Sequence, residues 1–238
     1  MKIATLNTWG RRGPAQRISV LREALRCLDA DVLCLQEAAD HALVSSLGYP
    51  TALHPSGSEL ALLSRFPAIG TRVVTFRTIS PLEPYHRQAL LAELELGSCT
   101  LWVVTTHLAW QAADGATRLA QMEELLETVA PLGEMVFVSG DMNASPDHPP
   151  IHRIRESGFR DLFAELNPKD PGITWDNQNP FIQSHTVRFP DRRIDYLFLH
   201  EKALSRIPLD RCEVVCQTPT ADGIYPSDHY GVLCDIHL

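Results

Sequence analysis

The chain has 238 residues, of which 45% are hydrophobic and 21% charged, values that are typical of a soluble globular protein. Its 29 acidic residues outnumber its 21 basic ones and give a net charge of -8, which argues against tight, non-specific binding to duplex nucleic acid. No apolar run approaches the ~20 residues of a membrane span and no signal peptide is recognisable, so we expect no membrane anchor and a cytoplasmic location.

Apolar and alternating runs predict strands along the whole chain, at residues 3–9, 32–36, 60–64, 72–76, 89–96, 101–107, 135–139, 194–199, 212–217 and 230–236. Helical spacing of apolar side chains predicts helices at residues 15–28, 116–129 and 150–156. We expect residues 60–76 and 89–107 to form hairpins. Residues 167–193 show no periodicity and predict a long loop, which in a compact domain is often functional.

Strands interspersed with helices predict an α/β fold in which two mixed sheets pack face to face and helices cover them. No repeat, low-complexity segment or Gly/Ser linker divides the sequence. One domain over residues 1–238 is therefore the favoured organisation.

The cysteines lie in apolar runs without Cys-x-x-Cys spacing or nearby histidines. We expect buried free thiols, and we expect neither a disulfide framework nor a zinc site. The residues concerned are Cys27, Cys34, Cys99, Cys212, Cys216 and Cys234.

Polar residues that could carry chemistry lie at or just beyond the ends of the predicted strands. They are Asn7, Glu37, His107, Asp141, Asn143, Asp195, Asp228 and His229. Taken singly, each has a structural explanation, because a carboxylate at a strand end is usually a cap or turn residue and a histidine is more often a core or surface residue. Together they indicate an active site, since the strand ends of one sheet converge on one rim.

Four carboxylates on one rim would need a cation. Two carboxylates about 4 Å apart repel by roughly 4 kcal/mol at an effective dielectric constant of ~20. The chain has only three lysines, and none is near these residues in the sequence. Oxygen ligands favour Mg²⁺ or Mn²⁺ over zinc, so the histidines are better suited to proton transfer or transition-state binding than to metal ligation.

Six short runs around these residues form an ordered set that spans nearly the whole chain. They are Thr5-Leu6-Asn7-Thr8-Trp9, Leu35-Gln36-Glu37, Thr105-Thr106-His107-Leu108, Gly140-Asp141-Met142-Asn143, Arg193-Ile194-Asp195-Tyr196 and Ser227-Asp228-His229. The set resembles the signature of the endonuclease/exonuclease/phosphatase superfamily, in particular its histidine-containing branch of deoxyribonucleases, sphingomyelinases and tyrosyl-DNA phosphodiesterases. The resemblance implies a four-layered α/β sandwich and Mg²⁺-dependent hydrolysis of a phosphodiester by in-line attack of water.

The resemblance also implies roles around the metal. Glu37 would be the principal ligand of Mg²⁺ or Mn²⁺, with Asn7 beside it and Asp228 assisting. Asp141 would orient or deprotonate the attacking water, and Asn143 would hold a phosphate oxygen.

Two histidines complete the implied catalytic set. His229 would accept a proton or stabilise the pentacovalent phosphorane, and Asp195 would orient it. His107 would bind the phosphate or protonate the leaving oxygen. Deoxyribonucleases have a glutamate after the arginine that corresponds to Arg87, whereas this chain has Gln88, which puts a carboxylate partner for His107 in doubt.

Aromatic and guanidinium side chains near these motifs are candidates for substrate contact. They are Trp9, Arg11, Arg12, Arg87, Trp175 and Arg188. Aromatic rings can stack on bases while arginines hold phosphates, although solvated loops and surface salt bridges explain the same residues. Trp102 and Trp110 are expected to be packing residues.

Nucleic acid, DNA or RNA, is the substrate that the resemblance favours. The alternative is a phosphatase or phosphodiesterase that acts on a small molecule or a lipid headgroup, which the acidic net charge favours. A binding module without catalysis is disfavoured because every motif position keeps a chemically competent residue. No obligate protein partner is evident.

Overall fold

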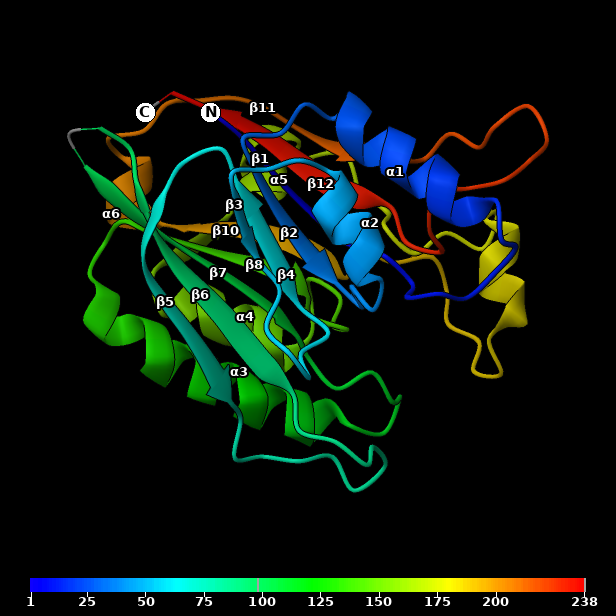
Figure 1. Ribbon diagram of the computed structural model, residues 1–238. Helices are drawn as coiled ribbons and strands as arrows, with labels where there is room; N and C mark the ends of the chain where they lie inside the picture. The colour runs from blue at the N-terminus through cyan, green and yellow to red at the C-terminus, as the bar shows by residue number, and fades with distance from the viewer. Residues whose placement is uncertain (98, 238) are drawn as a thin grey trace.

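In the computed structural model, which describes residues 1–97 and 99–237, two mixed six-stranded sheets pack face to face (Figure 1). The first sheet has the spatial order β11 (Leu209–Val215), β12 (Gly231–Ile236), β1 (Lys2–Asn7), β2 (Val32–Gln36), β4 (Ala61–Ser64) and β3 (Thr51–Leu53). The second has the order β5 (Ala68–Thr75), β6 (Gln88–Glu95), β7 (Thr100–His107), β8 (Val136–Asp141), β10 (Asp195–His200) and β9 (Phe159–Asp161).

Helices cover the outer faces of both sheets. On the first sheet lie α1 (Arg17–Cys27) and α2 (His41–Ser46), and on the second lie α3 (Gly115–Val129) and α4 (Pro149–Glu156) (Figure 1). The connections contain the short helices η1 (Ala130–Leu132), α5 (Leu162–Leu166), η2 (Pro180–Ser184) and α6 (Glu201–Leu204). The predicted four-layered α/β sandwich is confirmed. No helix in the described ranges is long and apolar enough to cross a membrane.

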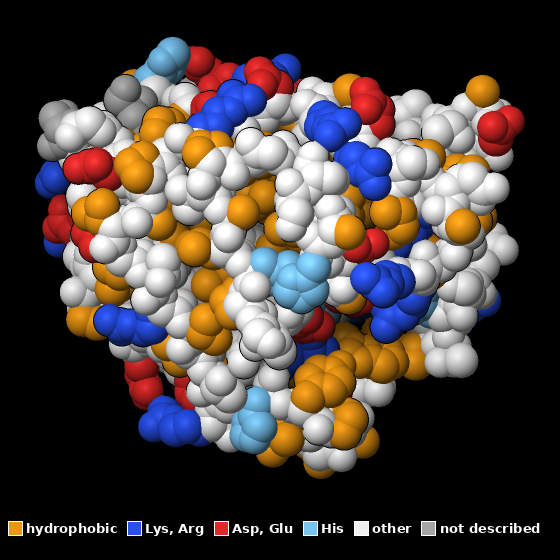
Figure 2. All heavy atoms as spheres, viewed as in Figure 1, with side chains coloured by type: hydrophobic (Ala, Val, Ile, Leu, Met, Phe, Trp, Pro, Cys, Tyr) orange, Lys and Arg blue, Asp and Glu red, His pale blue; other side chains and the backbone are white. Residues whose placement is uncertain are grey.

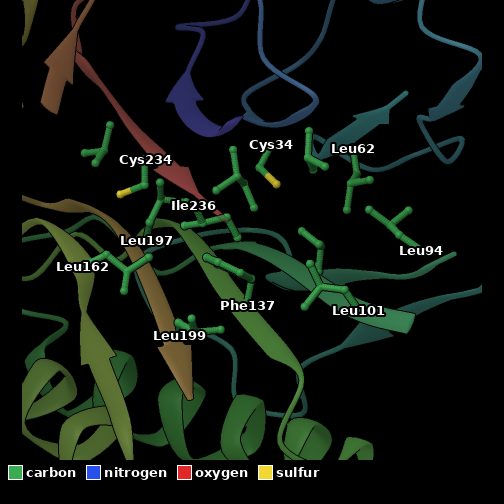
Figure 3. Close-up of a cluster of buried hydrophobic side chains, with 14 of the residues drawn as sticks. Cys34, Leu62, Leu94, Leu101, Phe137, Leu162, Leu197, Leu199, Cys234 and Ile236 are labelled. Carbon is green, nitrogen blue, oxygen red and sulfur yellow. The ribbon is translucent and has the colours of Figure 1, made fainter. Parts of the chain in front are cut away.

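The alternation of side chains along each strand explains the layers. In β1, Ile3 packs between the two sheets, whereas Ala4 and Leu6 pack under α1 and α2. Between the sheets, Cys34 from the first sheet belongs to the same apolar cluster as Phe137 from the second (Figure 3). Burial on both faces accounts for the nearly continuous apolar runs in the central strands.

The expectation that the site residues lie on the rim of one sheet is wrong, because they come from both sheets. Strand direction brings those of each sheet to one end of that sheet, and the packing of the two sheets brings these ends together at one cleft. β1 runs parallel to β2, and β7 runs parallel to β8, with a helix joining the strands of each pair. In register, Asn7 lies opposite Gln36, His107 opposite Asp141, and Asp141 opposite Asp195. β10 and β12 run antiparallel to β8 and β1, so these two strands begin where the parallel strands end.

Gly140 permits a close approach of two strands directly below the site. Its φ is +133°, and a Cβ at this position would lie 2.0 Å from the carbonyl oxygen of Thr106. Only glycine tolerates this conformation and this contact. The close approach holds Asp141 in register with His107 on the neighbouring strand.

The predicted hairpin at residues 60–76 is wrong, whereas the hairpin at residues 89–107 is confirmed as β6 and β7. β4 pairs with β2 and β3 in the first sheet, but β5 pairs with β6 in the second. A hairpin and a crossing between sheets both consist of two apolar strands with a short connection, so the pattern does not distinguish them. The elements that escaped prediction, such as β3 and β9, are too short to show a period.

The prediction for the cysteines is wrong in two respects. Cys212 and Cys234 form a disulfide, because they lie opposite each other in the antiparallel pair of β11 and β12 with their Cα atoms 4.1 Å apart. A separation of 22 residues conceals this pairing in the sequence. Of the free cysteines, Cys34 is buried, but Cys27 and Cys99 are exposed.

Candidate active site

A cleft of about 330 Å³ opens at the rim where the strand ends meet. Most of the predicted site residues line it: Asn7, Trp9, Arg12, Glu37, Arg87, His107, Asp141, Asn143, Trp175, Asp228 and His229. Asp195 is buried behind His229. Arg11 and Arg188 do not line the cleft, because Arg11 pairs with Asp40 and the Arg188 guanidinium donates to backbone carbonyls of η2.

Asp141 is the central carboxylate of the cleft. Its Oδ2 accepts a hydrogen bond from Nδ2 of Asn7 at 3.0 Å and lies 3.4 Å from Nε2 of His107 and 3.8 Å from Nε2 of His229. Burial alone would raise the pKa of Asp141, but the two imidazoles and the amide outweigh it and lower the pKa. Asp141 therefore remains an anion between two histidines.

His229 and Asp195 form a buried pair. Nδ1 of His229 lies 2.9 Å from Oδ2 of Asp195, and Trp175 packs edge-on against the imidazole at 5.1 Å. Burial raises the pKa of Asp195. Burial also opposes a charge on His229, but Asp195 and Asp141 outweigh it and raise the His229 pKa. The carboxylate thus fixes the ring so that Nε2 is the nitrogen nearer Asp141.

His107 also has a carboxylate partner, which removes the doubt raised by Gln88. Glu59 lies 3.0 Å from Nδ1 of His107, and Nη1 of Arg87 donates to the same Glu59 oxygen at 2.6 Å. Arg87 additionally binds Glu83, so two carboxylates hold its buried guanidinium in place. Burial and Arg87 oppose a charge on His107, but Glu59 and Asp141 raise its pKa.

Glu37 follows β2 and is a partly exposed carboxylate of the cleft. Its side chain is 22% exposed, its Oε2 accepts from Nη1 of Arg12 at 2.6 Å, and its Oε1 accepts from Nδ2 of Asn7 at 3.4 Å. Arg12 is itself 62% exposed, and a salt bridge of this kind contributes little in water. Glu37 can therefore exchange Arg12 for another cation.

Strained backbone is concentrated at this rim. Trp9, Glu37 and Asn143 have φ values of +57°, +49° and +47°, a region that costs a non-glycine residue about 1–2 kcal/mol. Local hydrogen bonds hold these conformations, for example from the Asn143 amide N–H to Oδ1 of Asp141. Such strain typically persists where a site requires a fixed side-chain direction.

Arg17 organises the loop between β1 and α1 and was missed by the sequence analysis. Its buried guanidinium donates to the carbonyl oxygens of Thr8, Gly10, Arg12 and Pro226, and this fixes one wall of the cleft. A signal was present in the sequence, because Arg17 occupies the buried face of α1 at helical spacing with the leucines that follow it.

The long loop at residues 167–193 reaches into the site. His185 Nε2 lies 2.8 Å from Oδ2 of Asp228, and the His185 ring packs against Trp175. Asn179 donates to the carbonyl oxygen of Ser227, whose hydroxyl donates to the carbonyl oxygen of Asn7. The loop thereby connects η2 to the end of β1.

The carboxylates of the cleft are paired with protein groups, which the sequence did not predict. Arg12 contacts Glu37 and His185 contacts Asp228, while the histidines flank Asp141. Protein groups therefore relieve the repulsion that was assigned to a metal.

Two groups of residues offer metal ligands. Asp141, Asp195 and His229 have potential ligand atoms within 4.8 Å of one another, but the His229–Asp195 hydrogen bond already uses two of those side chains. Glu37, Asn7 and Asp228 offer oxygen atoms, the donor type that hard divalent cations prefer.

Aromatic side chains form much of the cleft wall. Trp9 stacks on Phe181 with ring centroids 4.9 Å apart, and Trp175 and Phe189, which pack edge-on with ring centroids 6.4 Å apart, line the same cleft. Trp110, which was expected to be a packing residue, is half-buried on a loop after β7 and also lines the cleft. Trp102 packs against the apolar cluster under α3 and α4, as expected.

The sequence from residue 4 to residue 229 matches the sequence model of the Endonuclease/Exonuclease/phosphatase family. Nocturnin from Xenopus laevis is 25% identical over 267 residues, covering 92% of this chain and 64% of the relative. Tyrosyl-DNA phosphodiesterase 2 from Danio rerio is 24% identical over 176 residues, covering 72% of this chain and 46% of the relative. The chain thus spans less than two thirds of the length of these relatives.

Solved structures show the same fold. The D. rerio TDP2 structure complexed with a single-strand DNA product has a TM-score of 0.81 at 21% identity and covers 100% of this chain and 99% of that one. The human nocturnin catalytic domain with a bound sulfate anion has a TM-score of 0.73 at 18% identity, and the match covers 100% of this chain and 94% of that one.

Proposed function

The chain belongs to the endonuclease/exonuclease/phosphatase family, and on that premise we propose that it hydrolyses a phosphodiester with the help of Mg²⁺ or Mn²⁺. The observation that carries the proposal is the position of Asp141. It lies between two imidazoles that are each backed by a carboxylate, beside the amide of Asn7. The arrangement supplies proton donors, proton acceptors and oxygen ligands at one point of the cleft.

The residues can divide the work of hydrolysis as follows. Glu37 and Asn7 would hold the metal with the help of Asp228, and the bound metal would neutralise charge on the phosphate. Asp141 orients or deprotonates the attacking water, and Asn143 holds a phosphate oxygen.

The two histidines act on the charge and protons of the reacting phosphate. His229 accepts a proton or stabilises the charge that builds up on phosphorus, held in orientation by Asp195. His107, held by Glu59, binds the phosphate or protonates the leaving oxygen. Both imidazoles have raised pKa values, which favours their protonated, hydrogen-bond-donating forms and, for His229, favours charge stabilisation over acceptance of a proton.

Nucleic acid is the proposed substrate. The Danio rerio relative is by name a tyrosyl-DNA phosphodiesterase, and the neighbouring solved structure of that protein contains a DNA product. The aromatic wall around Trp9 and Trp175 suits the stacking of bases.

A small phosphate ester is the alternative, and two observations favour it. The net charge is -8, and on the face shown in Figure 2 the described basic and acidic side chains are interspersed. Of the arginines expected to contact the substrate, Arg11, Arg12 and Arg188 are all engaged by protein groups.

Metal binding at Glu37 is expected to raise the melting temperature of the wild-type protein, because a ligand that binds only the folded state stabilises it. Glu37→Gln should lose most of this increment, since the neutral amide is a weaker ligand for a hard cation. Differential scanning fluorimetry with and without Mg²⁺ or Mn²⁺ measures the effect. Glu95→Gln is the matched control, because Glu95 is exposed at the far end of β6. An equal metal-induced increment in all three proteins would place the metal elsewhere.

Nucleic-acid binding is expected to weaken steeply as salt rises, because contacts with phosphates release counterions. The measurement is fluorescence anisotropy of a labelled single-stranded oligonucleotide with a His229→Ala variant, across a salt series. A hydrolysis panel should accompany it, comparing bis-p-nitrophenyl phosphate, p-nitrophenyl phosphate, DNA, RNA and sphingomyelin. A nearly flat salt dependence, together with turnover of a small ester, would favour the alternative substrate.

A further inference from the structure

Arg192 differs from the other arginines around the cleft. Arg12 and Arg87 are paired with carboxylates, and the guanidinium groups of Arg17 and Arg118 donate to backbone carbonyls. Arg192 lines the cleft, yet its side chain makes no hydrogen bond or ion pair with any residue that the structure describes. Its buried Nε has no partner within the same described part of the chain.

The position of Arg192 is nevertheless well fixed. Its backbone forms a bridge with Trp175, with hydrogen bonds of 3.0 Å and 2.9 Å in the two directions. The guanidinium carbon lies 3.7 Å from the ring centroid of Phe189 and 5.7 Å from that of Trp175. A planar cation that is stacked on an aromatic ring keeps its hydrogen-bonding edge available for an anion.

Arg192 carries a charge at neutral pH, and its buried Nε lacks a hydrogen-bond partner among the residues that the structure describes. Burial lowers its pKa to about 10, partly offset by Asp141 and Asp195, so the guanidinium is a cation at neutral pH. A buried donor without a partner costs free energy, and its presence in a native structure requires an explanation. An anion that binds the guanidinium from the cleft offsets this cost, because it interacts with the whole delocalised charge.

We propose that Arg192 binds an anionic oxygen of the substrate phosphate, at a subsite formed with Phe189 and Trp175. The inference rests on the proposed function and deepens it, because it assigns a phosphate-binding residue that the sequence motifs did not single out. The ligand class is a phosphate mono- or diester. Planar guanidinium geometry matches two phosphate oxygens at once.

The test is calorimetric titration of inorganic phosphate into metal-free protein in the presence of EDTA. Arg192→Met retains a stem that can pack on Phe189 but removes the charge, and Arg188→Met is the matched control because Arg188 lies outside the cleft. Arg192→Met should weaken phosphate binding on the order of 10- to 100-fold, the range for losing a charged hydrogen bond. Arg192→Lys keeps the charge without the planar fork, so its phosphate affinity should lie between those of the wild type and Arg192→Met. Arg192→Gln replaces the methionine variant should that one fail to fold.

Parallel kinetics with bis-p-nitrophenyl phosphate and metal separate this inference from the proposed function. Equal phosphate affinity in wild type and Arg192→Met, or no phosphate binding by the wild type, would overturn the subsite. If the wild type hydrolyses the ester but the substitution leaves phosphate affinity and kcat/KM unchanged, the function stands and the subsite is wrong. If phosphate binding depends on Arg192 but no ester in the panel is hydrolysed, the subsite stands and the proposed function fails.

Discussion

His229→Ala is expected to lower kcat by a factor on the order of 10² to 10⁴, the usual range for losing a general acid or base. The imidazole is held by Asp195, and its Nε2 lies 3.8 Å from Asp141, the carboxylate that we propose positions the attacking water. The variant also leaves the buried Asp195 without its partner, and stability should therefore fall as well. His229→Asn can still donate to Asp195 and separates the catalytic effect from the structural one. His152 is exposed, and His152→Ala, as the control, should keep the kcat of the wild type.

A double-mutant cycle shows whether His229 and Asp195 act as a unit. Asp195→Asn should lower kcat in the same direction as His229→Ala. The double variant should lose less activation free energy than the sum of the single losses, because either change alone already disables the pair. Full additivity of the two effects would contradict the pairing. In that case His107, which also has a carboxylate partner, becomes the leading candidate for proton transfer.

The convergence of site residues within each sheet was predictable because it depends on strand direction, whereas the meeting of the two sheets at one cleft depends on how they pack. Asn7, Glu37, His107 and Asp141 follow runs that are plainly apolar, and parallel strands end at one edge. The same reasoning places Asp195 before β10, since an antiparallel neighbour begins where β8 ends.

The partners of these residues were harder to predict because they are distant in the sequence. Glu59 precedes β4 in the first sheet, yet it contacts His107 at the end of β7 in the second. His185 lies in a loop without periodicity, and only the folded loop brings it to Asp228. Pairing between sheets depends on how the two sheets pack, which a pattern within one strand does not report.

The partners of the crowded carboxylates were also not predictable from the sequence. The sequence shows that lysines are few, but it does not show that Arg12 bends back to Glu37 or that two imidazoles flank Asp141. A metal is therefore expected from the partly exposed carboxylate of Glu37 and from the family to which the chain belongs, rather than from repulsion between carboxylates.

Hydrolysis under strict control of metal tests the central claim most directly. The initial rate on bis-p-nitrophenyl phosphate is measured for the wild type with Mg²⁺ or Mn²⁺, after chelation with EDTA, and after metal is restored. Glu37→Gln and the remote Glu95→Gln are measured alongside. Because Glu37 is the proposed principal oxygen ligand, activity should disappear on chelation, return with added metal, and remain low in Glu37→Gln at metal concentrations that saturate the wild type. Full activity in the rigorously chelated wild type would contradict the account.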